Sequence, residues 1–126
     1  MLKRTRLGYH RAVAGLASAG NDVIMDYPLS EQWRLDDLLR TLQGYDVTLV
    51  EVRCSLEELE RRERDRGDRP VGLSRLQTTV CTHGERDIAV DTTSTDPQQC
   101  AVTIANALIT VPPPKAFDRL RRRLRA

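Results

Sequence analysis

The sequence has few cysteines, few histidines and no long apolar run, and each shortage excludes a class of protein. Its three cysteines, Cys54, Cys81 and Cys100, are odd in number and far apart, which argues against a disulfide framework. It contains no signal-peptide pattern and no apolar run of membrane-spanning length. We therefore expect a cytoplasmic protein with reduced thiols and no transmembrane segment.

The two histidines do not complete a metal-binding set. His83 follows Cys81 after one residue, but no Cys-x-x-Cys pair or second histidine lies near them, and His10 is far away along the chain. We therefore predict no metal site.

The size and composition fit a single domain with an unevenly charged end. The 126 residues are 40% hydrophobic and 30% charged, which is ordinary for a soluble protein. From Thr110 onward six basic residues face one acidic residue, whereas the rest of the chain has a net charge of −3. The body is mildly acidic and the C-terminal tail is basic.

An arginine-rich segment at residues 60–72 is the densest functional signal. Arg66 and Arg69 flank Gly67-Asp68 where a helix is expected to end, so two guanidinium groups can face one space and grip a phosphate. The alternative is a solvated helix face, because interleaved acids can form i,i+4 ion pairs with the arginines. These acids are Glu57, Glu58, Glu60, Glu63, Asp65 and Asp68.

Short apolar runs and helix signals predict alternating strands and helices. A helix ending at Gly20 precedes a strand at 23–25, and Asp26 at its end is the best candidate for a catalytic carboxylate. That aspartate is equally compatible with a turn cap. Ser30 caps a leucine-rich helix reaching Gln43, and a clear strand follows at 47–52.

Two further groups of residues are candidates for ligand binding. Tyr27, Leu29 and Trp33 are expected to wall a pocket for an aromatic substrate, or simply to pack. A last strand at 87–90 leads to Asp91, Thr92 and Thr93, whose polar groups either contact a nucleotide or satisfy a turn.

The end of the chain combines helix signals with a proline run. Ser55 and Glu58 form a capping-box pattern for the arginine helix, and Asp96 caps a later helix. Three prolines at 112–114 then precede a short basic stretch, which we expect to be mostly solvated and disordered. An acidic body, a nucleic acid or an anionic membrane are the alternatives that would order it.

The order of these motifs resembles the chloramphenicol phosphotransferase family across about Tyr9 to Leu108. The matching segments are GNDVIMD (20–26), EQWR (31–34), VRCSLEELERRE (52–63), RGDRPVG (66–72) and VDTT (90–93). Members of that family are P-loop kinases that transfer the γ-phosphoryl group of ATP to a hydroxyl of the antibiotic. The resemblance implies ATP and Mg²⁺ as cofactors and a small-molecule hydroxyl as substrate.

The resemblance also implies residue roles. Arg66 and Arg69 take the phosphate-clamp role of the lid, with Asp26 as the supporting carboxylate. Arg62 and the segment 91–93 lie on the nucleotide side. Tyr27 and Trp33 are assigned to the substrate side from their aromatic side chains and not from the resemblance.

The sequence departs from the family in its phosphate-binding loop. A P-loop kinase uses Gly-x-x-x-x-Gly-Lys-Ser/Thr, but the two lysines, Lys3 and Lys115, do not follow a glycine. The family's catalytic aspartate segment is absent as well. We therefore expect an inactive chain, or one that depends on another polypeptide.

The predicted fold is α/β, a three-layer and mainly parallel sheet of the P-loop kinase type, truncated to three strands with helices on both faces. Residues 1–110 form the partial kinase-like domain, with a lid at about 61–80, and residues 111–126 form the proline-linked tail. The open strand edges predict self-association. Alternatives to the phosphotransferase are a non-catalytic module that binds an anion, nucleotide or drug, and a gene fragment whose tail binds nucleic acid.

Overall fold

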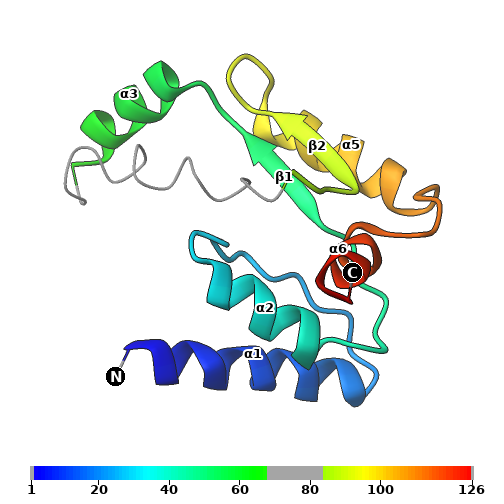
Figure 1. Cartoon of the computed structure of the whole chain (residues 1–126). Coiled ribbons are helices and arrows are strands. Elements are labelled where there is room, and N and C mark those ends of the chain that lie inside the picture. Colours follow the sequence, from blue (N-terminus) through cyan, green and yellow to red (C-terminus); the bar gives the residue numbers. More distant parts are fainter. Residues whose placement is uncertain (1, 68–83, 126) are drawn as a thin grey trace. The chain divides into compact units, whose positions relative to one another are not determined.

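A computed structural model describes residues 2–67 and 84–125 (Figure 1). The chain divides into two compact units, Met1–Val47 and Thr48–Ala126, which we describe separately. The predicted arginine Arg69 and most of the predicted lid lie outside the described residues. The predicted division of the chain at residue 110 stays a prediction.

The first unit is a pair of packed helices. Helix α1 spans Leu2–Ser18 and helix α2 spans Gln32–Thr41, and the leucine stripe of α2 is buried as its spacing predicts. Gly20 has φ 92°, so the predicted left-handed stop after α1 is confirmed. The predicted cap of α2 is wrong: the N-cap is Glu31 rather than Ser30, and its side chain makes no capping hydrogen bond.

The predicted strand at 23–25 is absent. These residues follow α1 as an irregular segment, and Ile24 is fully exposed. A short apolar run becomes a strand only when a neighbouring strand satisfies its amides and carbonyls. The first unit contains no strand among its described residues, so nothing there pairs with this segment.

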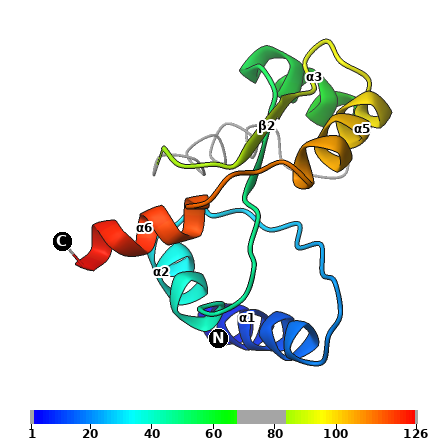
Figure 2. The same ribbon diagram turned by 90° about the vertical axis from the view of Figure 1, so that its right-hand side faces the viewer.

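The second unit contains a two-stranded parallel sheet with helices around it. Strand β1 spans Val50–Arg53 and pairs in parallel with strand β2, Ile88–Asp91. Helix α5, Pro97–Leu108, packs on β2 and lies along it in both views (Figure 1 and Figure 2). The two later strands of the prediction therefore exist, in a smaller sheet than expected.

Helix caps in the second unit follow the sequence closely. Helix α3 spans Leu56–Arg66, with Ser55 as its side-chain cap and Gly67 in the left-handed conformation at φ 67°. The Asp96 side chain accepts a hydrogen bond from the amide of Gln98 and begins α5 as predicted. Both ends of the arginine helix are thus set by local sequence.

The basic stretch after the prolines is a helix, which corrects the expectation of a solvated, disordered tail. Helix α6 spans Ala116–Arg125. The Asp87 carboxylate accepts a hydrogen bond from the amide of Ala116 at 2.8 Å, and Arg119 forms an ion pair with Glu85. The acidic and polar groups just before β2 therefore hold the start of this helix.

No helix in the described ranges 2–67 and 84–125 is both long enough and apolar enough to cross a membrane.

Candidate functional site

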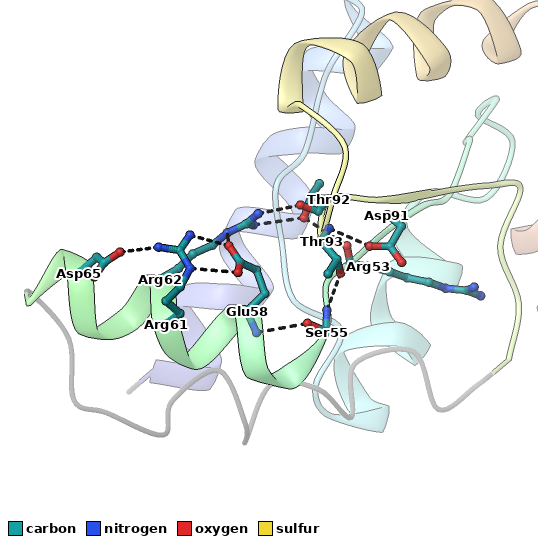
Figure 3. Close-up of polar contacts among 9 residues, drawn as sticks. All are labelled: Arg53, Ser55, Glu58, Arg61, Arg62, Asp65, Asp91, Thr92 and Thr93. Atoms are coloured by element: carbon teal, nitrogen blue, oxygen red, sulfur yellow. Dashed lines mark hydrogen bonds and ion pairs between the residues drawn. The ribbon is translucent and has the colours of Figure 1, made fainter.

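The first turn of α3 is hydrogen-bonded to the loop that follows β2 (Figure 3). Ser55 Oγ accepts a hydrogen bond from the amide of Glu58 at 3.2 Å. The amide of Ser55 donates to Thr93 Oγ1 at 2.8 Å, and the amide of Thr92 donates to the carbonyl of Arg53 at 2.8 Å. The carboxyl ends of both strands and the helix start therefore form one connected region, where parallel sheets bind ligands.

Arg62 bridges α3 to this loop. Its Nη2 donates to the carbonyl oxygen of Thr92 at 2.7 Å, and its Nη1 donates to Thr92 Oγ1 at 3.2 Å. Its Nε donates to Glu58 Oε1 at 3.0 Å, so the guanidinium is held on two sides. Figure 3 shows Arg62 directed from the helix toward Thr92. The structure thus brings together Arg62 and Thr92, two of the predicted nucleotide-side residues.

Of the other two residues of that prediction, Asp91 ends β2 and Thr93 lies in the loop that follows. Asp91 Oδ1 accepts a hydrogen bond from the amide of Thr93 at 2.8 Å. Hydrogen bonds from the Thr93 side chain and backbone lower the pKa of Asp91. This carboxylate therefore stays ionised at neutral pH and shapes the turn.

Ion pairs cover part of the arginine helix, as the alternative interpretation of the sequence predicted. Arg61 donates to both carboxylate oxygens of Glu58 and to Asp65. The hydrogen bond from Arg61, followed by that from Arg62, lowers the pKa of Glu58 to about 2. Glu58 is thus a permanent anion that orients both arginines.

A shallow, open hollow of about 230 Å³ lies beside this network. Its lining residues are charged or polar and come from α3, the N-cap of that helix and the loop after β2: Ser55, Glu57, Glu58, Arg61, Arg64 and Thr93. A polar, open surface of this kind suits a charged or sugar-like part of a ligand better than an apolar ring.

The predicted clamp is described only in part. Arg66 is the last residue of α3 and is exposed, immediately before the left-handed Gly67. Because Arg69 lies outside the described residues, their convergence on one phosphate stays a prediction.

In the first unit, the predicted substrate-side residues Tyr27 and Trp33 lie around a buried histidine. His10 is fully buried, and its Nε2 is 2.9 Å from the hydroxyl of Tyr27. The rings of His10 and Trp33 are 6.4 Å apart. Trp33 Nε1 donates to Glu31 at 2.8 Å, and this bond lowers the pKa of Glu31. The pair is packed, as the alternative interpretation allowed, and a pocket between them remains a prediction.

The opposite nitrogen of His10 contacts a buried carboxylate. His10 Nδ1 is 2.6 Å from Asp37 Oδ2, and the Asp37 side chain is 5% exposed. Burial raises the pKa of Asp37, but hydrogen bonds from His10 and Arg40 outweigh it, so the pKa lies below its usual value. Asp37 is therefore an ionised acceptor.

Sequence reasoning missed this buried pair. The available signals were weak: Asp37 interrupts the leucine stripe of α2, and His10 lies three residues before the buried Val13 on α1. Neither signal reveals that the two helices place these side chains together. Asp26 is exposed between the helices, and its catalytic role stays a prediction.

Metal ligands do not cluster in the part of the chain that the structure describes. No group of three or more histidine, cysteine, aspartate or glutamate side chains there is arranged to hold an ion. Cys54 and Cys100 are free thiols, and Cys81 lies outside the described residues.

Comparison with known proteins identifies the family. The family model for chloramphenicol phosphotransferase-like proteins matches residues 1–109. The chain belongs to this family. The loop after β2 and the described part of the arginine helix both fall within the matched residues.

Two curated proteins of Mycobacterium tuberculosis are similar to this family member. One is from strain CDC 1551 / Oshkosh and the other from strain ATCC 25618 / H37Rv, and each carries the name "Putative O-phosphotransferase". Each is 36% identical over 115 residues, which cover 90% of this chain and 51% of the relative. The chain therefore spans about half the length of these relatives.

Proposed function

We propose that this chain supplies the arginine helix and the nucleotide-side loop of an ATP-dependent O-phosphotransferase. The observation that carries the proposal is the bridge from Arg62 to Thr92, which fixes a guanidinium at the carboxyl ends of β1 and β2. Kinases use positioned arginines to neutralise charge on the transferring phosphoryl group. Family membership supports the same assignment.

Among the described residues, the arginines of α3 support the proposed contacts to the phosphates of ATP. The guanidinium groups of α3 match the donor geometry that phosphate oxygens require. The described residues do not fit Mg²⁺, since they offer no set of three acidic or histidine ligands. The sequence also contains no glycine-rich loop ending in Gly-Lys-Ser/Thr. We therefore propose contacts to the nucleotide and derive no step through the metal.

The acceptor is proposed to be a hydroxyl of a small molecule, such as the antibiotic that gives the family its name. We further propose that the 126 residues by themselves bind a nucleotide weakly and do not transfer phosphate. Transfer needs backbone amides, a lysine and a metal ion acting together on the developing charge, and the sequence lacks the lysine loop.

The proposal is tested by titrating the purified chain with a fluorescent ATP analogue. Two charge-assisted contacts of about 1.5–3 kcal/mol each, less the cost of ordering, support an affinity of roughly millimolar to high micromolar. We expect Arg62→Ala to weaken binding by at least about fivefold, since it removes one charged contact. Arg122→Ala is the matched control, because Arg122 is an exposed arginine of α6 in the same unit.

The test compares the nucleotide affinities of the Arg62→Ala and Arg122→Ala variants. Equal affinities for Arg62→Ala and Arg122→Ala would show that the bridge has no part in nucleotide binding. Separately, incubation with labelled ATP and chloramphenicol should give no product above a buffer blank. Turnover above that blank would contradict the proposed lack of transfer.

Nucleic-acid binding by the basic tail receives less support than its composition suggested. Arg119 and Arg123 both form ion pairs with Glu85, and Arg121 pairs with Asp118. These charges are partly neutralised within the chain, which weakens the counterion-release term that drives such binding.

A further inference from the structure

Glu31 binds two side chains of the first turn of α2 instead of capping that helix. Its Oε2 accepts a hydrogen bond from Trp33 Nε1 at 2.8 Å, and its Oε1 accepts one from Arg34 Nη2 at 3.0 Å. Although Glu31 is the N-cap residue, its side chain makes no capping hydrogen bond. The Trp33 bond, followed by Arg34 and the charge of Arg6, lowers the pKa of Glu31, so this carboxylate is ionised at neutral pH.

The contact between Glu31 and Arg34 uses only half of one guanidinium edge. Nε and Nη2 share an edge, and together they bind a carboxylate or phosphate through two parallel hydrogen bonds. Arg61 binds Glu58 in this way through Nε and Nη2. In Arg34, Nη2 bonds to Glu31 and Nη1 bonds to the carbonyl oxygen of Pro28, but Nε has no hydrogen-bond partner.

The unpartnered Nε of Arg34 indicates that another acceptor can complete this edge. Arg34 is only 7% exposed, and a buried donor without a partner costs free energy. The second oxygen of Glu31 does not fill the position, because it accepts from Trp33. A ligand with one more oxygen would satisfy all three donors, which are Nε and Nη2 of Arg34 and Nε1 of Trp33.

Further positive charge lies around the same aromatic side chains. Lys3 Nζ is 5.0 Å from the ring centre of Trp33, and the guanidinium carbon of Arg6 is 5.9 Å from that of Tyr27. The guanidinium carbon of Arg34 is 5.7 Å from the first ring and 5.5 Å from the second. The buried Nε of Arg6 also has no hydrogen-bond partner. These three cations together outweigh the one carboxylate that they surround, so the group favours an added anion.

We propose that Arg34 and Trp33 form a binding site for a phosphate-type oxyanion, and that the Glu31 carboxylate is an internal stand-in for this ligand. One carboxylate already reaches both side chains, so a phosphate group of similar width can do the same. Its additional oxygen then accepts from Nε of Arg34. Arg6 and Lys3 contribute positive charge that attracts the anion.

The ligand class is inorganic phosphate or the phosphate group of a small phosphorylated molecule. All the residues of this site belong to the first unit, whereas the nucleotide contacts proposed for Arg62 belong to the second. The inference therefore goes beyond the proposed function and does not rest on it.

Trp33 provides the signal for a direct test, because it is the only tryptophan of the chain and one of the proposed ligand contacts. The purified chain is titrated with inorganic phosphate, with sodium chloride added to keep the ionic strength constant. We expect a saturable change in tryptophan emission, with a Kd of roughly millimolar. An emission that does not saturate, or that responds equally to chloride alone, would overturn the proposal.

A second titration with glycerol phosphate distinguishes the two sources of the ligand. Equal affinities would assign the site to the phosphate group alone, and tighter binding of the ester would assign it to a phosphorylated molecule. Failure of both compounds to bind would contradict the site. Because neither compound is a nucleotide, this failure is distinguishable from a failure of the proposed nucleotide binding.

Glu31→Gln tests whether the carboxylate competes with the ligand. Glutamine keeps the length of the side chain but removes the negative charge, so we expect phosphate to bind at least about fivefold more tightly. Asp36→Asn is the matched control, because it removes a neighbouring acid of α2 that bonds to Gln32 outside this group. A gain in affinity cannot result from partial unfolding. Equal affinities for the two variants would refute the role of Glu31 as a stand-in.

Arg34→Lys tests the guanidinium edge while keeping the positive charge. Lysine has no planar pair of donors, so we expect phosphate to bind at least about tenfold more weakly. Arg4→Lys, at an exposed position of α1, should leave the affinity unchanged. Circular dichroism checks that each variant keeps its helices. Unchanged affinity in folded Arg34→Lys would overturn the proposal, and if that variant does not fold, the comparison of Glu31→Gln with Asp36→Asn decides.

Discussion

Asp37→Ala should destabilise the first unit more than an alanine substitution of any other charged residue in that unit. The substitution removes a charge-assisted hydrogen bond of about 1.5–3 kcal/mol and leaves Nδ1 of the fully buried His10 without its partner. Local rearrangement around His10 recovers part of these two losses, so we expect the free energy of unfolding to fall by about 2–4 kcal/mol. That is a large part of the roughly 5–15 kcal/mol typical of a whole domain.

Urea unfolding followed by circular dichroism measures this loss, with Asp36→Ala as the matched control. Asp36 is the neighbouring acid of α2 and accepts only an exposed hydrogen bond from Gln32, so its loss should change stability by less than about 0.5 kcal/mol. Equal unfolding midpoints for the two variants would refute the argument that the buried pair supports the helices.

The effect of Asp37 should also depend on pH in a stated direction. Its pKa is lowered in the folded state, so its stabilisation is present above the unfolded value of about 3.9 and is lost as the pH falls through the folded value. The difference between the wild type and Asp37→Ala should therefore shrink below about pH 4. A difference that grows on acidification would contradict the assigned sign.

Three further predictions concern the second unit. Arg62→Ala should cost about 1 kcal/mol in urea unfolding through its lost bonds to Thr92, whereas Arg61→Ala, which loses only surface ion pairs, should leave the midpoint within error. Glu85→Gln should make the first turns of α6 unfold more readily, because it removes the ion pairs to Arg119 and Arg123 of that helix. Limited proteolysis should then cut the variant after the proline run faster than the wild type. Val52→Lys should reduce self-association in size exclusion with light scattering, since Val52 is 62% exposed on β1 and an exposed strand of this kind invites pairing; identical monomer profiles for wild type and variant at all concentrations would contradict it.

Local signals predicted the arginine helix well because its ends depend on nearby residues. Ser55 and Gly67 act within one turn of the helix, so their chemistry is readable from sequence alone. The segment Asp91 to Thr93 was also placed correctly at the end of a strand, although Asp91 is the last residue of β2 rather than the first after it. The contact of Thr92 with Arg62, thirty residues away, was not predicted, since both residues were only assigned to the nucleotide side.

The errors arose where structure depends on distant partners. The run at 23–25 has the composition of a buried strand, but composition cannot supply a neighbouring strand, and Ile24 is exposed. The basic tail has the composition of a disordered segment, but Glu85, well before it in the sequence, pairs with its arginines. In the same way, His10 and Asp37 are 27 residues apart and carry no shared local motif.

The proposed separation of binding from catalysis follows from the size of the interactions. Two guanidinium contacts supply about 3–6 kcal/mol before the cost of ordering, which is enough for weak nucleotide binding. Enzymes lower their reaction barriers by about 8–23 kcal/mol, so arginines on α3 cannot account for phosphoryl transfer by themselves. The largest remaining term is stabilisation of charge by amides, a lysine and a metal ion, which the glycine-rich loop of a P-loop kinase provides. Adding a polypeptide that carries such a loop should therefore restore transfer in a chain that keeps Arg62, and should fail to restore it when Arg62 is replaced.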